Sequence, residues 1–152
     1  MIEIERKFLV KSDQFKNEAH RKTQISQGYL TKDPSRTVRI RIRDQKGFIT
    51  IKGKSTESGL SRFEWEKEIP SEEAHQLLQL CLPVIIEKCR YEVKFKNVVF
   101  EIDEFIGHHR GLVLAEVELK SENQKIDLPN WIGEEVTGNK NYYNSSLSEL
   151  KV

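Results

Sequence analysis

Hydrophobic and polar residues alternate with a period of two along most of this chain. The first segment, IEIERKFLV at 2–10, places isoleucine and phenylalanine on one face and Glu3, Glu5 and Lys7 on the other. This period is typical of β-strands. The same pattern recurs at 37–44, 48–54, 62–69, 88–95, 98–105 and 114–120. Turn signals such as KDPS, DQKG and TESG fall between several of these segments, so the pattern predicts mostly antiparallel β-structure.

One segment carries a clear helical signal, PSEEAHQLLQLCL at 70–82. Ser71 is a suitable N-cap, and two glutamates follow it in the first turn. Because Pro83 stops a helix, we expect this one to run from Ser71 to about Leu82. A short helix or turn is expected within 11–19, and a helical turn within 141–150. The predicted class is therefore mainly β (α+β), with a few helices.

Composition and charge restrict the function. The 152 residues are enough for one domain, 1–152, with a buried core. The 25 Lys and Arg residues nearly balance the 24 Asp and Glu residues, which argues against a general nucleic-acid binder. No apolar run is long enough to cross a membrane, and the start shows no secretory signal pattern. Cys81 and Cys89 lack metal-ligand or redox spacing, so we expect reduced cysteines and a cytoplasmic location.

The charged faces of the strands carry like charges side by side. Glu3 with Glu5, and Arg39 with Arg41, stand two positions apart, which is roughly 6.5–7 Å along a strand. Any one such strand is usually a solvated sheet face. Here the pattern recurs on nearly every strand and in both signs. A closed antiparallel barrel with these faces inward would form a wet, charged tunnel suited to a polyphosphate and its metal, although the alternation alone is also compatible with an ordinary sandwich.

The segment EIERK at 3–7 is the Glu-x-Glu-x-Lys signature of the CYTH superfamily, the triphosphate tunnel metalloenzymes. It is followed in order by QGYL, TVRIRIR, FITIKGK, SRFEWEKEIP, EKCRYEV, FEIDEFIGHHRGLVLAEVEL and EEVTGNKNYYN. Together these blocks resemble the bacterial short-chain inorganic triphosphatases over nearly the whole chain. The resemblance implies a closed antiparallel β-barrel tunnel whose charged faces point into the lumen, with a few flanking helices.

The resemblance also implies roles for the charged residues. Mg²⁺ or Mn²⁺ would be bound by carboxylates, since hard cations prefer oxygen ligands. The candidate metal ligands are Glu3, Glu5, Glu116 and Glu118, with Glu64, Glu66 and Asp103 as further lumen carboxylates. The candidate phosphate-binding residues are Lys7, Arg39, Arg41, Arg62, Lys88 and Arg90. Arg43 shares the parity of Arg39 and Arg41 but is outside the family pattern, and we expect it at the tunnel mouth or on the surface.

Some family members activate water with a Lys–Tyr pair, and Lys52 and Tyr29 occupy the matching places. A lysine acts as a base only when its pKa is lowered, for instance by neighbouring cations. The alternatives left open are a phosphate contact for Lys52 and a packing role for Tyr29.

The function indicated is a divalent-metal-dependent triphosphatase that releases orthophosphate from inorganic tripolyphosphate or a related triphosphate. Alternatives are a class IV-type adenylate cyclase, a thiamine or nucleoside triphosphatase, and a non-catalytic polyphosphate-binding module. The expected partner is a small-molecule triphosphate, with no nucleic acid and no membrane. A homodimer is compatible with the resemblance.

Overall fold

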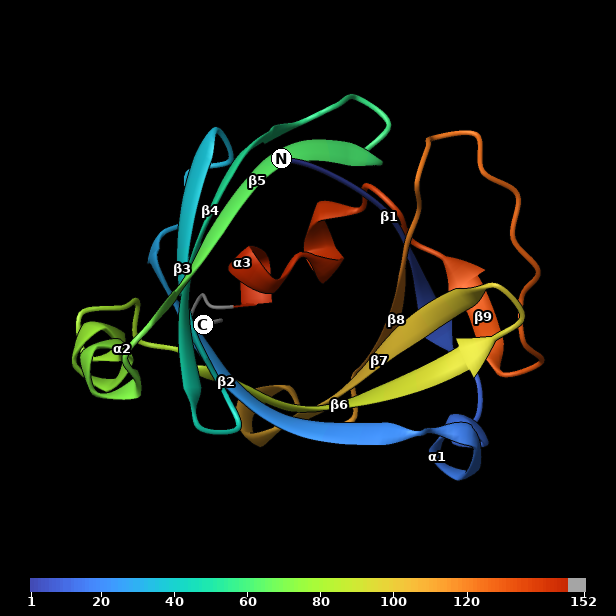
Figure 1. The fold of residues 1–152 in the computed structure, drawn as a ribbon, viewed down its shortest axis with the longest axis horizontal. Helices are drawn as coiled ribbons and strands as arrows, with labels where there is room; N and C mark the ends of the chain where they lie inside the picture. The colour runs from blue at the N-terminus through green and yellow to red at the C-terminus, as the bar shows by residue number, and fades with distance from the viewer. Residues whose placement is uncertain (148–152) are drawn as a thin grey trace.

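The computed structural model describes residues 1–147, in which β-strands dominate (Figure 1). The strands are β1 (Ile2–Val10), β2 (Arg21–Thr31), β3 (Arg36–Arg43), β4 (Lys46–Ser55), β5 (Ser61–Ile69), β6 (Ile86–Phe95), β7 (Val98–Ile106), β8 (Val113–Glu118) and β9 (Ile132–Glu135). The helices are α1 (Phe15–Glu18), α2 (Ser71–Leu78) and α3 (Asn144–Leu147), with 3-10 turns at Gly107–His109 and Lys140–Tyr142.

The strands form one antiparallel sheet in the order β5-β4-β3-β2-β6-β7-β8-β1-β9. A short additional pairing of β1 with β5, through Ile2, Glu3 and Ile4, joins the two sides of the sheet and closes an eight-stranded barrel. The ninth strand, β9, pairs with the other end of β1 near Phe8 and Val10. The closed antiparallel barrel predicted from the sequence is confirmed.

The largest apolar cluster lies outside the barrel wall, in agreement with the inward charged faces that the family resemblance implied. The outward residues of β6, β7 and β8 pack against α1, β9 and the segment that precedes β9. Trp131 is 1% exposed and makes edge-to-face contacts with Phe15 and Phe100 at centroid distances of 5.9 and 5.7 Å. Apolar burial on this side keeps the charged faces of the same strands turned inward.

Helix α2 covers the outer face of β3 and β4. Ala74 packs on Ile40 and Ile42, and a Cβ at Gly47 would lie 2.6 Å from the Ala74 Cβ, so glycine permits the close approach. The helix ends at Leu78, one turn earlier than expected, and Pro70 rather than Ser71 occupies the N-cap position. The final residues before Pro83 instead form successive turns, so the prediction of a helix to about Leu82 was wrong.

One end of the barrel is closed by apolar side chains and by α3. Tyr29, Phe105 and Leu114 face inward here and pack with Ile86 and Leu147. Figure 1 shows α3 within the ring of strands. The helical turn expected in the tail is confirmed, and the polar lumen begins just beyond this apolar layer.

Candidate active site

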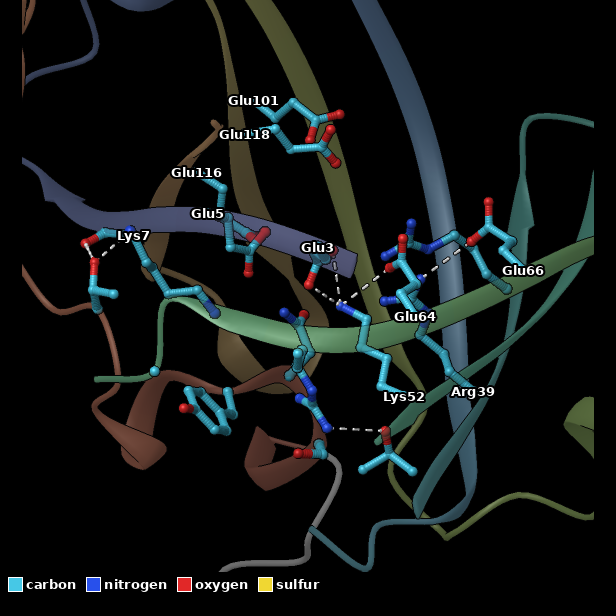
Figure 2. A pocket seen from close by; sticks show the side chains of 18 of the residues that line it. Glu3, Glu5, Lys7, Arg39, Lys52, Glu64, Glu66, Glu101, Glu116 and Glu118 are labelled. Carbon is cyan, nitrogen blue, oxygen red and sulfur yellow. Dashed lines mark hydrogen bonds and ion pairs between the residues drawn. The ribbon is translucent and has the colours of Figure 1, made fainter. Parts of the chain in front are cut away.

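A cavity of about 180 Å³ runs into the barrel and is lined almost entirely by polar side chains (Figure 2). Charged residues reach it from strands β1, β3, β4, β5, β6, β7 and β8. In Figure 2 the carboxylates of Glu5, Glu116, Glu118 and Glu101 gather on one side, and Lys52 and Arg39 lie on the other. The lumen therefore has an acidic wall and a wall of mixed charge.

The acidic wall follows from strand register. Glu5 lies directly opposite Glu118, and Glu116 lies directly opposite Glu101, so carboxylates from three adjacent strands are neighbours. Burial, together with Glu116 and Glu3, raises the pKa of Glu5 well above its ordinary value. Although burial acts in the opposite direction, Lys7 and the hydrogen bond with Glu5 lower the pKa of Glu116. The pair is therefore stable when it shares a proton, and a cation can take the place of that proton.

The donor set fits a hard divalent cation. Glu3, Glu5, Glu116 and Glu118 supply only oxygen atoms, and their crowding would be relieved by positive charge. Within residues 1–147 no three of these groups are already gathered around a single point as ligands. Binding would require small side-chain movements, such as release of Glu3 from its contact with Lys52.

Lys52 joins the two walls. Its Nζ lies 2.9 Å from Glu3 Oε1 and 3.5 Å from Glu64 Oε2. Burial opposes the lysine charge, but Glu3, Glu5 and Glu64 outweigh it, so the pKa of Lys52 is raised. Lys52 is thus an ammonium group in this arrangement. Tyr29, the other member of the expected pair, lines the same cavity and is 5% exposed.

Arg39 is held by the neighbouring strands. Its Nη2 lies 3.2 Å from Thr50 Oγ1 and 3.6 Å from Glu66 Oε2, and the threonine hydroxyl donates to the same carboxylate at 2.7 Å. The Nε of Arg39 is buried without a hydrogen-bond partner among the described residues. A buried donor without an acceptor is costly, so the described part of the protein alone does not satisfy the hydrogen-bonding capacity of Arg39.

A second ion-pair group lies in the wall between β6 and β7. Asp103 accepts from Arg90 Nε and Nη2 at 2.8 and 2.9 Å, and its Oδ2 lies 2.7 Å from Lys88 Nζ. Although burial acts against its charge, Arg90 and Lys88 hold the pKa of Asp103 well below its usual range. Burial, with Arg90 and Arg41 nearby, lowers the pKa of Lys88 to about 7. Arg90 lines the cavity, whereas Lys88 and Asp103 lie behind it.

Three further cations are held by neutral groups. Lys7 Nζ donates to the Tyr142 carbonyl at 3.1 Å, and Arg62 Nε donates to the Gly53 carbonyl at 3.0 Å. Arg41 Nε donates to Gln27 Oε1 at 2.8 Å. Within residues 1–147, no carboxylate lies within ion-pair distance of Lys7, Arg41 or Arg62. Their charge is available to an anion.

The C-terminal segment forms part of the tunnel wall. It meets the β4–β5 loop where Gly59 and Gly138, both at positive φ, lie so close that a Cβ at Gly59 would be 2.3 Å from the Gly138 Cα. Beyond this crossing, Tyr143 lies under Lys7 Nζ at 5.5 Å from the ring centroid. Asn144 reaches the cavity and accepts from both Gln27 and Lys88.

The structure brings most of the candidate residues to one cavity. The lining set contains Glu3, Glu5, Glu64, Glu66, Glu116, Glu118, Lys7, Arg39, Arg41, Arg62, Arg90, Lys52 and Tyr29. Two charged lining residues were not among the candidates. Glu101 is one of them. The sequence feature that could have identified it is its position two residues before Asp103, on the same face of the same strand. Arg43 is the other; its guanidinium lies 4.8 Å from the centroid of the Phe48 ring.

A family model for the CYTH domain matches residues 1–151. The chain belongs to the CYTH family. It is 47% identical over 146 residues to the inorganic triphosphatase of Acetivibrio thermocellus, covering 95% of this chain and 92% of that one. It is 40% identical to the inorganic triphosphatase of Nitrosomonas europaea, covering 97% of each. The crystal structure of an inorganic triphosphatase superposes with a TM-score of 0.68 at 36% identity, over 96% of this chain and 93% of that one.

The family match confirms the resemblance drawn from EIERK and the blocks that follow it. CYTH triphosphate tunnel enzymes depend on metal, in agreement with the acidic wall. Among the described residues, no helix has the length and apolar character needed to span a membrane.

The acidic wall predicts a linked effect of pH and metal on stability. Because the pKa of Glu5 is raised above its ordinary value of 4.5, the folded protein binds more protons there than the unfolded chain. The stability from this group is complete at low pH and is lost as pH rises through the raised pKa. Mg²⁺ should offset that loss, so we expect it to raise Tm by about 3 °C more at about pH 8 than at about pH 5.

Thermal unfolding in Mg²⁺ and in EDTA at the two pH values measures this difference. The Glu5→Gln variant serves as the control and should lose most of the pH dependence. An equal Mg²⁺ effect at both pH values would contradict the assignment.

Proposed function

We propose that this protein is a divalent-metal-dependent triphosphatase that hydrolyses inorganic tripolyphosphate to pyrophosphate and orthophosphate inside the barrel. The observation that supports this most directly is one cavity that combines crowded carboxylates with cations that have no carboxylate partner among residues 1–147. A triphosphate with its metal matches both halves of such a site. The named relatives are inorganic triphosphatases, which agrees with this reading.

In this proposal Glu3, Glu5, Glu116 and Glu118 hold Mg²⁺ or Mn²⁺, and Glu101 adds negative charge beside them. The bound metal supplies charge neutralisation on the phosphate oxygens. Lys7, Arg39, Arg41, Arg62 and Arg90 hold the phosphate chain. Asp103 stays behind the wall and holds Arg90, and Lys88 pairs with the same carboxylate. Water attacks the terminal phosphorus, the P–O bond to the next phosphate breaks, and its electron pair leaves with pyrophosphate.

The role of Lys52 follows from its contacts. Paired with Glu3 it is charged, so it is suited to hold a phosphate oxygen or to orient the attacking water. It can accept a proton only when Glu3 turns to another cation. Tyr29 is buried and lines the same cavity, and in this proposal its hydroxyl helps to orient the water.

The Lys52→Ala variant separates these roles. If Lys52 acts on the water, kcat should fall about 100-fold or more while KM changes by less than about threefold. If it holds phosphate, KM should rise and kcat should change little. Steady-state hydrolysis of tripolyphosphate across substrate concentrations gives both values, and Lys54→Ala, an exposed neighbour on the same strand, is the control.

The size of the cavity favours an inorganic substrate. Its volume of about 180 Å³ is below the roughly 300–1,000 Å³ typical of sites for larger organic ligands. One observation supports an organic triphosphate as the second candidate. A cavity of about 470 Å³ adjoins the tunnel at Thr37, Arg62 and Tyr143, and a thiamine or nucleoside group would fit there.

One assay tests the proposal. Orthophosphate release is measured from tripolyphosphate, thiamine triphosphate and ATP, with Mg²⁺ and with Mn²⁺, and cyclic AMP is measured from ATP. We expect tripolyphosphate to be the best substrate, with no cyclic product. Faster release from an organic triphosphate would favour the second candidate. Cyclic AMP with pyrophosphate would overturn the proposal in favour of a cyclase, and binding of tripolyphosphate without turnover would leave a polyphosphate-binding module.

We also propose that the protein acts in the cytoplasm on a small-molecule triphosphate and binds neither nucleic acid nor membrane. Its two cysteines are free thiols, which agrees with a reducing compartment.

A further inference from the structure

Two buried arginines of the tunnel differ in the residue that faces them across the sheet. Arg90 on β6 lies directly opposite Asp103 on β7, and Arg41 on β3 lies directly opposite Gln27 on β2. Both arginines are 7% exposed, and both line the cavity. Arg90 therefore has a carboxylate as its cross-strand partner, whereas Arg41 has a neutral amide on a side chain of similar length.

The Gln27 amide contacts only the Nε edge of the Arg41 guanidinium. Arg41 Nε donates to Gln27 Oε1 at 2.8 Å. Within residues 1–147, the two Nη groups of Arg41 donate to no protein acceptor, and neither is a buried atom without a partner. They consequently open onto the tunnel, where they can reach a ligand.

Gln27 is itself held rigidly. Its side chain is completely buried, and its Nε2 donates to Asn144 Oδ1 at 3.1 Å. The same oxygen accepts from Lys88 Nζ at 3.1 Å, so Asn144 ties the glutamine to the ion-pair group of the wall. The amide orientation of Gln27 is fixed by these neighbours, with its oxygen facing Arg41 and its nitrogen facing Asn144.

The charged form of Arg41 is energetically disfavoured in this environment. Burial, together with Arg39 and Arg90, lowers the pKa of Arg41 to about 9. Asp103 is near enough to attract it electrostatically, yet no carboxylate lies within ion-pair distance of it among the described residues. An anion in the tunnel would supply the missing negative charge.

We propose that Gln27 is a positioning residue that orients Arg41 toward the substrate while leaving its charge unneutralised, so that the triphosphate supplies the balancing charge. A glutamate at this position would make the same contact to Nε but would compete with the substrate. The inference rests on the proposed function, because it takes the ligand of Arg41 to be a triphosphate.

Two variants of the same residue test the proposal. Gln27→Met removes the hydrogen bonds to Arg41 and Asn144 without adding charge. Gln27→Glu also loses the donor to Asn144 but keeps an acceptor for Arg41 and adds a negative charge. We expect Gln27→Glu to raise KM for tripolyphosphate at least about tenfold, and more than Gln27→Met does, with kcat changed less than about threefold. Thermal stability should rank the two variants the other way from the strength of substrate binding, with Gln27→Glu more stable than Gln27→Met, because the introduced carboxylate faces Arg41.

Weaker substrate binding together with a higher Tm in Gln27→Glu than in Gln27→Met is the result that the proposal predicts. A glutamine that served only as a structural acceptor would be replaced well by glutamate, and KM would rise more in Gln27→Met. Gln24→Glu adds the same charge on the exposed face of the same strand and controls for net charge. A KM for Gln27→Glu within about twofold of the parent would overturn the proposal.

Calorimetric binding of tripolyphosphate and of pyrophosphate to all four proteins distinguishes this failure from failure of the proposed function. If the parent binds these anions without hydrolysing tripolyphosphate, the function fails and the order of Kd still decides the role of Gln27. If the parent hydrolyses tripolyphosphate and Gln27→Glu binds it equally well, only the role of Gln27 fails. If the parent binds neither anion, both fail.

Discussion

Replacement of Glu5 by glutamine is expected to abolish triphosphate hydrolysis and to leave the fold intact. Burial, together with Glu116 and Glu3, raises the pKa of Glu5, so the fold favours the neutral form of this carboxyl more than water does. Glutamine resembles that neutral form, and Tm in EDTA should therefore hold or rise. The same substitution removes a charged oxygen that the metal needs, and we expect kcat/KM to fall by at least about 100-fold.

Orthophosphate release and thermal unfolding, measured on the same preparations, test both halves of this expectation. Glu134→Gln, at an exposed position of β9, is the matched control and should behave like the parent. Near-normal turnover of Glu5→Gln would remove Glu5 from the metal site. Loss of activity together with a lower Tm would instead indicate a structural role.

Much of the barrel could be predicted because its two faces differ so strongly in chemistry. Alternation assigned Glu3 and Glu5 to one face and Ile4 and Phe8 to the other, and the structure keeps that separation. Strand β2 was not among the predicted strands. Its inward positions include Thr23 and Gln27, which are polar but uncharged, so its two faces differ little in the sequence. Strand β9 has only four residues and is too short for a periodic signal.

The residues that line the site could be predicted from the sequence better than the ion pairs they form. Parity along a strand shows which side chains face the lumen, but ion pairs depend on which strands meet when the barrel closes. Lys52 and Glu3 are 49 positions apart and meet because β1 pairs with β5 across the seam. Gln27 carries no charge, and its importance becomes visible only when register places it opposite Arg41. Asn144 is likewise brought to the tunnel by the C-terminal segment, outside any strand pattern.

The largest effect on stability is expected from Asp103→Asn. Asp103 is 2% exposed and contacts two buried cations, Lys88 and Arg90, at 2.7–2.9 Å. Removing the shared carboxylate leaves both without their main partner, and breaking a buried pair in this way costs about 3–5 kcal/mol. Lys88 can lose its proton, since burial lowers its pKa to about 7, but Arg90 cannot, and Glu101 contacts only one of its nitrogens. Urea unfolding followed by circular dichroism measures the loss.

The exposed pair Lys96–Asp127 provides the control, because its atoms are 3.1 Å apart but both side chains are more than half exposed. Asp127→Asn should cost less than about 1 kcal/mol. Adding Lys88→Met to Asp103→Asn should restore part of the lost stability, because it removes one of the two buried cations left without a partner. If Asp103→Asn costs no more than Asp127→Asn, the ion pairs behind the tunnel do not stabilise the barrel, and the support of Arg90 must come from Glu101 and the sheet alone.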